Sequence, residues 1–417
     1  MLTLSLLALT CQHAAIAQPK EEMAKKLQKA EEDTEDEELS ELRERLRALE
    51  QQIDEMRQAQ SAVDSEEVPL DLETQVHGFA AVKADIYEGA PLGFALDELV
   101  FTYSSNLDRK YTFYSEIAFE PAEEMVAVDV EQVQLTLQFS DAFGLFVGRL
   151  HAPHSYWAMK EFHGSYRYLP VATPEVLALE DHGGGYMPMH QTGVFANGAL
   201  DMGLSRFLYI VGTSNGRSPL IGGIAQSGDW GWGKAVTGRF SIEAPSGLLM
   251  GVGGYFDLVD PGAAADTLGE FGNVLPETMT EAIGGYHIVY DSRALYFASE
   301  GYVLSQNMGD STGGLSYGGY LLAGPHIKKT TPYINIDVLS LVPESALVAV
   351  GTEPEAENKA GIGVRHDFAL RAALKFQLDA IQEVHYAESV GADGTVSYGD
   401  KETEMGIGAH MQLAAGF

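Results

Sequence analysis

Cysteine, positive charge and long hydrophobic runs are all scarce in this chain of 417 residues. The single cysteine is Cys11, and it lies in a segment that we expect to be removed. The rest of the chain can therefore form neither a disulfide framework nor a thiolate metal site. Asp and Glu total 60 against 26 Lys and Arg, which gives a formal net charge of −34. This charge argues against a nucleic-acid partner, because phosphate binding requires a basic surface.

No stretch after residue 17 approaches the ~18–20 consecutive apolar residues that a membrane-spanning helix requires. Membrane strands stay open as a possibility, since their alternating side chains escape a hydropathy scan. The zinc-protease pattern H-E-x-x-H and a phosphate-binding glycine loop are missing as well. We therefore predict that the protein is not an enzyme and uses no cofactor. Outer-membrane phospholipases and proteases are the alternative, because alternation alone does not exclude their Ser/His/Asn or Asp/His groups.

Residues 1–17 have the features of a secretory signal peptide. An apolar run over residues 2–9 precedes small residues that end at Ala17, which favours cleavage before Gln18. No Lys or Arg stands ahead of this run, which departs from the usual pattern. Cleavage before Cys11, to give a lipoprotein, is the alternative.

Residues 18–75 are strongly acidic, with 19 Asp and Glu against eight Lys and Arg. Apolar residues within them recur at alternating spacings of three and four, which is the a/d seam of a heptad repeat. They are Leu39, Leu42, Leu46, Leu49, Ile53 and Met56. Three heptads are marginal as an isolated helix. We therefore predict a short N-terminal α-helical coiled coil that pairs with copies of itself, followed by an acidic linker. A single solvated helix or a disordered linker is the alternative.

Over residues 76–417 the apolar period becomes two, the period of a β-strand. The clearest example ends the chain, where small or polar residues alternate with Met405, Ile407, Ala409, Met411, Leu413, Ala415 and Phe417. Elsewhere Gln, Arg, Lys and Asp fill the alternate positions, as between Val133 and Phe139. Segments of about 9–11 residues have the length of a tilted membrane strand. We predict an all-β fold, a transmembrane antiparallel up-and-down β-barrel of about 16 strands.

The connections between these segments are short and long in turn. The segments begin near residues 76, 96, 110, 129, 143, 190, 203, 234, 247, 281, 293, 315, 328, 358, 370 and 404. Tight turns at one end of a barrel and large loops at the other produce this pattern. The longest connection, His151–Gln191, is the third large loop on this count and holds five of the twelve histidines.

Two segments carry a resemblance to a known family. They are FVGRLHAPHSYW (Phe146–Trp157) and the last strand, GIGAHMQLAAGF, which ends on Phe417. Together with the signal peptide and the loop pattern, they make the chain resemble Gram-negative outer-membrane porins. Within that family it looks most like the phosphate-selective porin O/P-like group with an N-terminal coiled coil.

The resemblance implies a homotrimer in the cell outer membrane, in contact with lipid and lipopolysaccharide, with the coiled coil in the periplasm. It also implies that the barrel-assembly machinery reads Phe417 and that the third outer loop narrows the pore. One departure concerns selectivity. A phosphate-selective pore would carry a dense Arg and Lys ladder, whereas residues 76–417 hold 18 basic and 41 acidic residues.

On this basis we predict that residues 151–191 fold into the bore as a constriction loop. The predicted constriction residues are His151, His154, Trp157, Glu161, His163, Arg167, Glu180, Asp181 and His182. The predicted pore-lining residues, taken from polar positions of alternating strands, are Gln134, Arg206, Arg239, Arg365, Arg371 and Lys375.

The pattern His-x-x-His at His151 and His154, with further acids nearby, is compatible with a transition-metal site. A constriction loop also needs polar side chains for its own hydrogen bonds. We therefore predict a structural network and no bound metal.

The function that these features favour is a porin, a passive diffusion channel for small hydrophilic solutes or ions. One alternative is a non-conducting barrel that tethers the envelope or acts as an adhesin or receptor. Another is an acidic soluble β-protein of the periplasm.

Overall fold

The computed structural model describes residues 73–417, apart from residues 109, 123–124, 162, 179–186, 219, 222–232, 262–272, 310–312, 344, 346–354 and 391–395. The predicted signal peptide and coiled coil therefore lie outside the described residues, as do Glu180, Asp181 and His182 of the predicted constriction. Among the described residues, no helix is long and apolar enough to cross a membrane.

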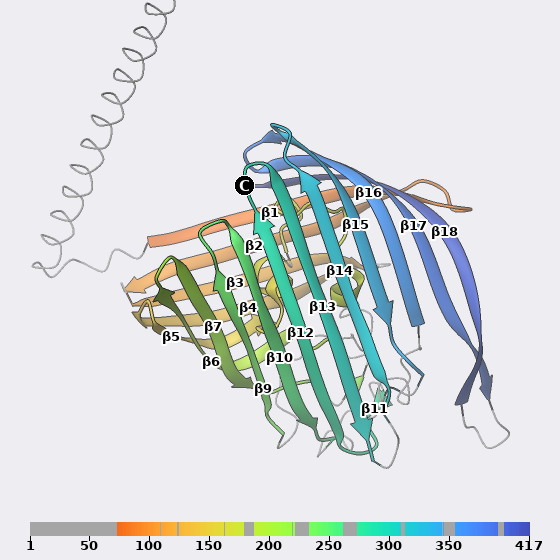
Figure 1. The fold of residues 1–417 in the computed structure, drawn as a ribbon, viewed down its shortest axis with the longest axis horizontal. Helices are drawn as coiled ribbons and strands as arrows, with labels where there is room; N and C mark the ends of the chain where they lie inside the picture. The colour runs from red at the N-terminus through yellow and green to blue at the C-terminus, as the bar shows by residue number, and fades with distance from the viewer. Residues whose placement is uncertain are drawn as a thin grey trace, which may run out of the picture. The chain divides into compact units, whose positions relative to one another are not determined.

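Sixteen strands form one closed antiparallel barrel (Figure 1). Each of these strands pairs with the barrel strands before and after it in the chain, and β1 pairs with β18. The predicted up-and-down barrel is thus confirmed. Its strands are β1 (Glu73–Tyr87), β2 (Gly93–Asp108), β3 (Tyr111–Ala122), β4 (Met125–Ser140), β5 (Phe143–His151), β6 (His190–Met202), β7 (Ser205–Ser214), β9 (Ala235–Glu243), β10 (Leu248–Val259), β12 (Met279–Asp291), β13 (Leu295–Met308), β14 (Leu315–Pro325), β15 (Thr330–Ser340), β16 (Glu355–Ala369), β17 (Ala372–Val390) and β18 (Val396–Gly416).

The strand boundaries follow the predicted segments with two differences. The predicted alternation of short and long connections is wrong between the segments near residues 110 and 129, because β3 ends at Ala122 and β4 begins at Met125. The last strand begins at Val396 rather than near residue 404, since its polar first half still pairs with β17 as far as Val390. Both differences arise because backbone hydrogen bonding between the strands continues past the residues that alternate between apolar and polar.

Side-chain alternation sorts the barrel into an apolar outer face and a polar inner face. On β17 and β18 the outward Leu378 and Ile407 are 53% and 61% exposed. The inward Lys375 and Gln412 on the same strands are fully buried. An outward apolar band with a polar lumen is the arrangement of transmembrane β-barrels.

The last residue closes the barrel against the first strand. Phe417 exchanges two backbone hydrogen bonds with Gly78, at 2.7 and 2.8 Å. The aromatic ring of Phe417 lies over Gly78, where a Cβ would stand 2.4 Å from a ring carbon, so a larger residue here would displace the ring. The ring of Phe101 packs edge-on against Phe417, with 6.1 Å between their centroids.

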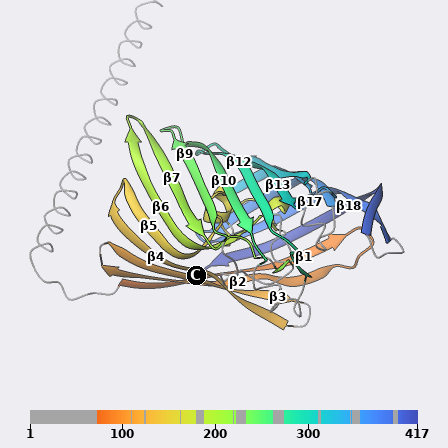
Figure 2. The ribbon, with the colours of Figure 1, turned by 90° about the horizontal axis from the view of Figure 1, so that it is seen from below.

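The described part of the chain between β5 and β6 lies inside the barrel. It contains two short helices, α2 (Tyr156–Lys160) and α3 (Glu175–Ala178). In both views they appear in yellow within the ring of strands (Figures 1 and 2). A buried cluster joins Trp157 and Val176 of this segment to Tyr302 and Leu322 of the wall. We call residues 152–189 the inner loop.

Two short strands lie outside the barrel sheet. They are β8 (Leu220–Ile221) and β11 (Asn273–Val274), and they pair with each other in a two-stranded sheet. Their pairing links the connection after β7 to the connection after β10.

Candidate functional site

The inner loop begins with a capped helical turn. Ser155 Oγ accepts a hydrogen bond from the backbone N–H of Ala158 at 3.1 Å and so caps α2. The turn ends where the N–H of Glu161 donates to the carbonyl of Trp157 at 2.7 Å. The Trp157 ring is fully buried, with ring centroids of Tyr168 and Tyr320 at 5.1 and 5.3 Å.

Glu300 on β13 holds this helix against the wall. The backbone N–H of Trp157 donates to its Oε1 at 2.7 Å, and the N–H of Tyr156 donates to its Oε2 at 2.8 Å. The Tyr320 hydroxyl donates to Oε1 at 2.8 Å. One buried carboxylate thus accepts the free N–H groups at the start of α2 and fixes the helix to a strand that neighbours neither β5 nor β6.

The middle of the inner loop is held by β16, β17 and β18. Arg365 Nη1 donates to the carbonyl of Tyr168 at 2.6 Å, and Lys375 Nζ donates to that of Pro170 at 2.7 Å. Gln412 Nε2 donates to the carbonyl of Val171 at 2.9 Å. Since four strands separate β13 from β6 and four separate β18 from β5, these contacts lie across the barrel from the ends of the loop, and the inner loop crosses the bore.

Three of the predicted pore-lining residues, Arg239, Arg365 and Lys375, lie on the inner face but bind the inner loop. Arg239 Nη1 donates to the Ser155 carbonyl at 2.5 Å, and Lys375 Nζ also lies 4.3 Å from the centroid of the Tyr168 ring. Alternation identified the face on which these cations lie. It carried no information about which backbone carbonyls would occupy the bore in front of them.

The other three predicted pore-lining residues are placed differently. Gln134 faces the bore from β4 and donates to Thr136 Oγ1 at 3.0 Å. Arg206 shares the strand face of the buried Ile210, near the turn between β6 and β7, and forms an ion pair with Asp201 at 3.3 Å. The placement of Arg371 on a pore-lining strand is corrected: it is exposed in the turn between β16 and β17, because β17 begins at Ala372.

The described constriction residues do not all face open space. His154 is buried against the Tyr255 ring, with centroids 5.7 Å apart. Burial, reinforced by the charge of Arg239, lowers the pKa of His154 to about 3, so its imidazole is neutral. Burial likewise raises the pKa of Glu161. Arg167 Nη2 donates to the carbonyl of His163 at 2.5 Å.

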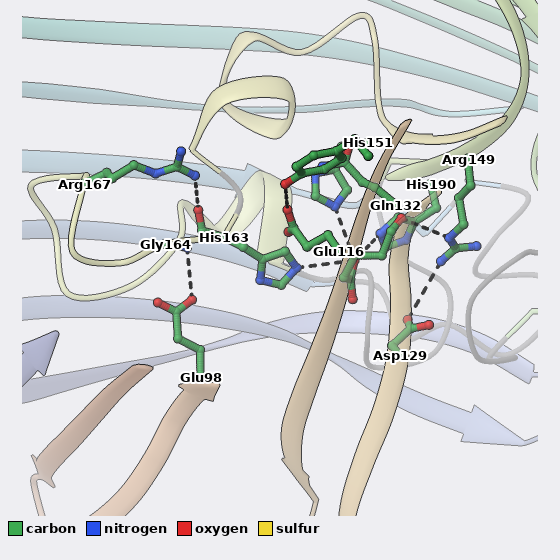
Figure 3. Close-up of polar contacts among 12 residues, drawn as sticks. Glu98, Glu116, Asp129, Gln132, Arg149, His151, His163, Gly164, Arg167 and His190 are labelled. Atoms are coloured by element: carbon green, nitrogen blue, oxygen red, sulfur yellow. Dashed lines mark hydrogen bonds and ion pairs between the residues drawn. The ribbon is translucent and has the colours of Figure 1, made fainter. Parts of the chain in front are cut away.

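Three histidines gather on one carboxylate at the base of the inner loop (Figure 3). His151 Nε2 and His163 Nε2 each lie 3.3 Å from Glu131 Oε2, and His190 Nε2 contacts the same oxygen. Burial lowers the pKa of His163, but the hydrogen bond and charge of Glu131 outweigh this effect and raise it to about 9. Gln132 holds the other nitrogen of His151, with Nε2 3.0 Å from Nδ1.

Glu131 is a functional residue that the sequence reasoning missed. The ladder between β3 and β4 pairs Glu116 with Gln132 and Ile117 with Val130, so Glu131 is the extra residue of a β-bulge. The bulge turns both Glu131 and Gln132 toward the histidines. The sequence does contain a sign of this bulge. The exposed apolar residues of β4 lie at even positions up to Val130 and at odd positions from Val133.

Arg217, in the connection after β7, was missed as well. Its backbone N–H donates to Asp257 Oδ2 at 2.8 Å, and its Nε donates to Glu281 Oε2 at 2.9 Å. Gly216 precedes it with φ +72, and a Cβ there would lie 2.1 Å from Asp257, so only glycine fits. A second connection is thus fixed to the inner wall by buried charges.

Residues 212–216, GTSNG, match the G-x-S-x-G pattern of serine hydrolases. That pattern needs a strand-to-helix turn that exposes the serine. Here Ser214 ends β7, and its Oγ donates to Gln191 Oε1 at 3.3 Å. No helix follows it in the described residues, so this segment does not form a nucleophile elbow.

Space remains in the bore beside α2. A cavity of about 340 Å³ lies between this helix and the walls formed by β5 to β10. Polar and apolar side chains share its lining, which includes Tyr156, Met159, Lys160, Asn197, Tyr209, Arg239 and Ser241. Among the residues that the structure describes, the inner loop therefore shares the bore with this cavity.

No protein-family model and no curated protein match the sequence. Solved structures do match the fold. An anion-selective porin from Comamonas acidovorans superposes with a TM-score of 0.56 at 10% identity, covering 83% of this chain and 100% of that one. The outer membrane channel DcaP of Acinetobacter baumannii gives a TM-score of 0.55 at 9% identity over 83% and 97%.

A third structure is OmpT, an outer membrane protein of Vibrio cholerae, in its trimer form. It gives a TM-score of 0.54 at 8% identity and covers 82% of this chain and 99% of that one. At these identities the likeness concerns the backbone alone. The described strands of this chain therefore have the fold of these outer-membrane porins and channels.

Proposed function

We propose that the protein is an outer-membrane porin, a passive diffusion channel for small hydrophilic solutes or ions in which residues 151–191 set the pore size. The observation that carries the proposal is the inner loop. It crosses a closed barrel, is bound by side chains of β9, β13, β16, β17 and β18, and leaves a cavity with polar lining beside α2.

The two faces of the barrel support this proposal. The outer face presents side chains such as Val128 and Ile362, 61% and 62% exposed, which suit contact with lipid. Charged side chains of the inner face hydrogen-bond to the backbone of the inner loop, so the loop has one defined position. A channel needs such a fixed polar constriction to select solutes by size and charge.

We propose in addition that the barrels associate as a homotrimer. One similar structure is a trimer form, which supports this state. An apolar groove of about 570 Å³ on the outer face of β1 and β16 to β18 supports it too, because it can bury side chains of a second copy. Ile86, Phe94, Ile362, Phe376 and Met411 line this groove.

Planar-bilayer recording of the purified, folded full-length protein tests the proposal. We expect stepwise conductance, with three sub-levels for each insertion of a trimer. A reversal potential measured in a salt gradient then gives the sign of the selectivity.

A folded protein that inserts without any conductance steps would refute the channel. It would favour the alternative of an envelope-tethering, adhesin or receptor barrel, with which the dense anchoring of the inner loop is also compatible. Heat-modifiable migration on a gel shows that the barrel is folded and so makes a negative recording informative.

A further inference from the structure

The histidine cluster lies where the inner loop leaves and rejoins the wall. His151 and His190 face each other as the last pair of the ladder between β5 and β6. His163 comes from within the loop, and Glu131 comes from the bulge of β4. Glu116 of β3 adds a second carboxylate, whose ligand oxygen lies within 4.8 Å of the ring nitrogens of His151 and His163.

Two of the distances between these atoms match those between the ligands of a metal ion. Zinc binds imidazole nitrogen and carboxylate oxygen at ~2.0–2.2 Å, so the ligand atoms of a tetrahedral site lie roughly 3.3–3.5 Å apart. The distances from Glu131 Oε2 to Nε2 of His151 and of His163 are both 3.3 Å. One ligand atom each from Glu131, His151 and His190 also lies within 4.8 Å of the others.

Hydrogen bonds alone account poorly for this arrangement. One carboxylate oxygen offers two lone pairs, yet three imidazole nitrogens converge on Glu131 Oε2. In addition, Glu116 Oε1 is buried and makes no hydrogen bond to any described residue. A buried oxygen left without a partner is costly unless water or an ion satisfies it.

The surroundings also prepare the site. Gln132 lies against Nδ1 of His151, which leaves Nε2 directed at Glu131, as an outer partner fixes a metal-binding histidine. Glu131, His151 and His190 are no more than 3% exposed, so water does not compete for them. Metal binding would displace the proton of His163, and the two carboxylates would then balance the charge of a divalent cation. Figure 3 shows the side chains of His151, His163 and His190 directed toward one another, with Glu116 beside them.

We propose that His151, His163, His190 and Glu131, with Glu116 as an additional ligand, form a binding site for a divalent transition-metal ion, Zn²⁺ first among them. Imidazole and carboxylate together suit Zn²⁺, whereas the absence of cysteine here disfavours soft ions. The ion would join both ends of the inner loop to its middle and to β4. This site stands on its own geometry and does not depend on the proposed channel function.

The test uses the full-length protein, stripped of metal by a chelator, and Zn²⁺ alone as the probe. We expect titration calorimetry and metal analysis after gel filtration to give one tightly bound Zn²⁺ per chain. Replacing His190→Gln or His163→Ala should weaken binding at least about 100-fold, more than the loss of an outer-shell partner. Co²⁺ in place of Zn²⁺ should give the intense visible absorption of a four-coordinate site.

His385→Ala is the matched control, because His385 belongs to an exposed group with Glu383 and Glu404 and should not change the tight site. Uptake that is equal in His190→Gln, His163→Ala and the unmodified chain would overturn the proposal, as would the absence of uptake in a folded protein. His163→Ala keeps the test decisive if His190→Gln does not fold, since His163 lies in the loop rather than in a strand.

Discussion

Deleting residues 155–181 should raise the single-channel conductance at least about two-fold, because the narrowest section of a pore limits the current through it. The deletion removes α2, α3 and the carbonyls that bind Arg365, Lys375 and Gln412. It keeps the ladder between β5 and β6 up to its last pair, His151 and His190. Since those two residues are neighbours, a shortened connection can close without disturbing the strands.

Two measurements make this result interpretable. Heat-modifiable migration shows whether the shortened chain still forms the barrel. The conductance of Arg371→Ala serves as the control, because Arg371 is exposed in the turn between β16 and β17. An unchanged conductance in a folded deletion variant would mean that the inner loop is not the constriction.

Replacing Glu300→Ala should release α2 from the wall. The carboxylate accepts the N–H groups of Tyr156 and Trp157, and each buried group left without a partner costs about 1–3 kcal/mol. The docking of this helix should therefore weaken by about 2–6 kcal/mol, while the strand ladder of β13 stays intact. Trypsin, which cleaves after basic residues, should then cut the inner loop at Lys160 and Arg167.

The cleavage pattern separates this local release from unfolding of the barrel. The unmodified chain should resist trypsin in the inner loop, and Glu300→Gln should fall between it and Glu300→Ala, because the amide still accepts one of the bonds. Glu383→Ala is the control, since its carboxylate is half-exposed and pairs only loosely with His385 at 3.5 Å. Equal resistance in Glu300→Ala would show that this anchor does not hold the loop.

The sequence alone predicted the barrel because side-chain alternation reports directly on the two faces of a strand. One face of β17 carries apolar side chains, which favour an apolar surrounding: Leu374, Phe376 and Leu378. The other face carries Lys375 and Gln377, which favour a polar surrounding. The length of His151–Gln191 singled out the loop that lies in the bore. These features depend on local patterns, which a single sequence contains in full.

The contacts of the inner loop depend on residues far apart in the chain, and local patterns do not contain them. Nothing in the spacing of Glu300 or Lys375 shows that they bind the backbone near Trp157 and Pro170. The bulge at Glu131 breaks the alternation by one residue, and the histidine cluster depends on that break. The spacing of the histidines along the chain does not show that Glu131 and Glu116 lie beside them.

The most direct test of the conducting path is the current through a channel carrying Met159→Cys, whose new cysteine is the only one after removal of residues 1–17. Met159 of α2 lines the cavity in the bore, whereas Leu378 faces outward from β17. We expect a charged methanethiosulfonate reagent to reduce the current in steps through Met159→Cys and to leave Leu378→Cys unchanged. A constant current through Met159→Cys, with mass spectrometry confirming that the cysteine has reacted, would contradict a solute path beside the inner loop.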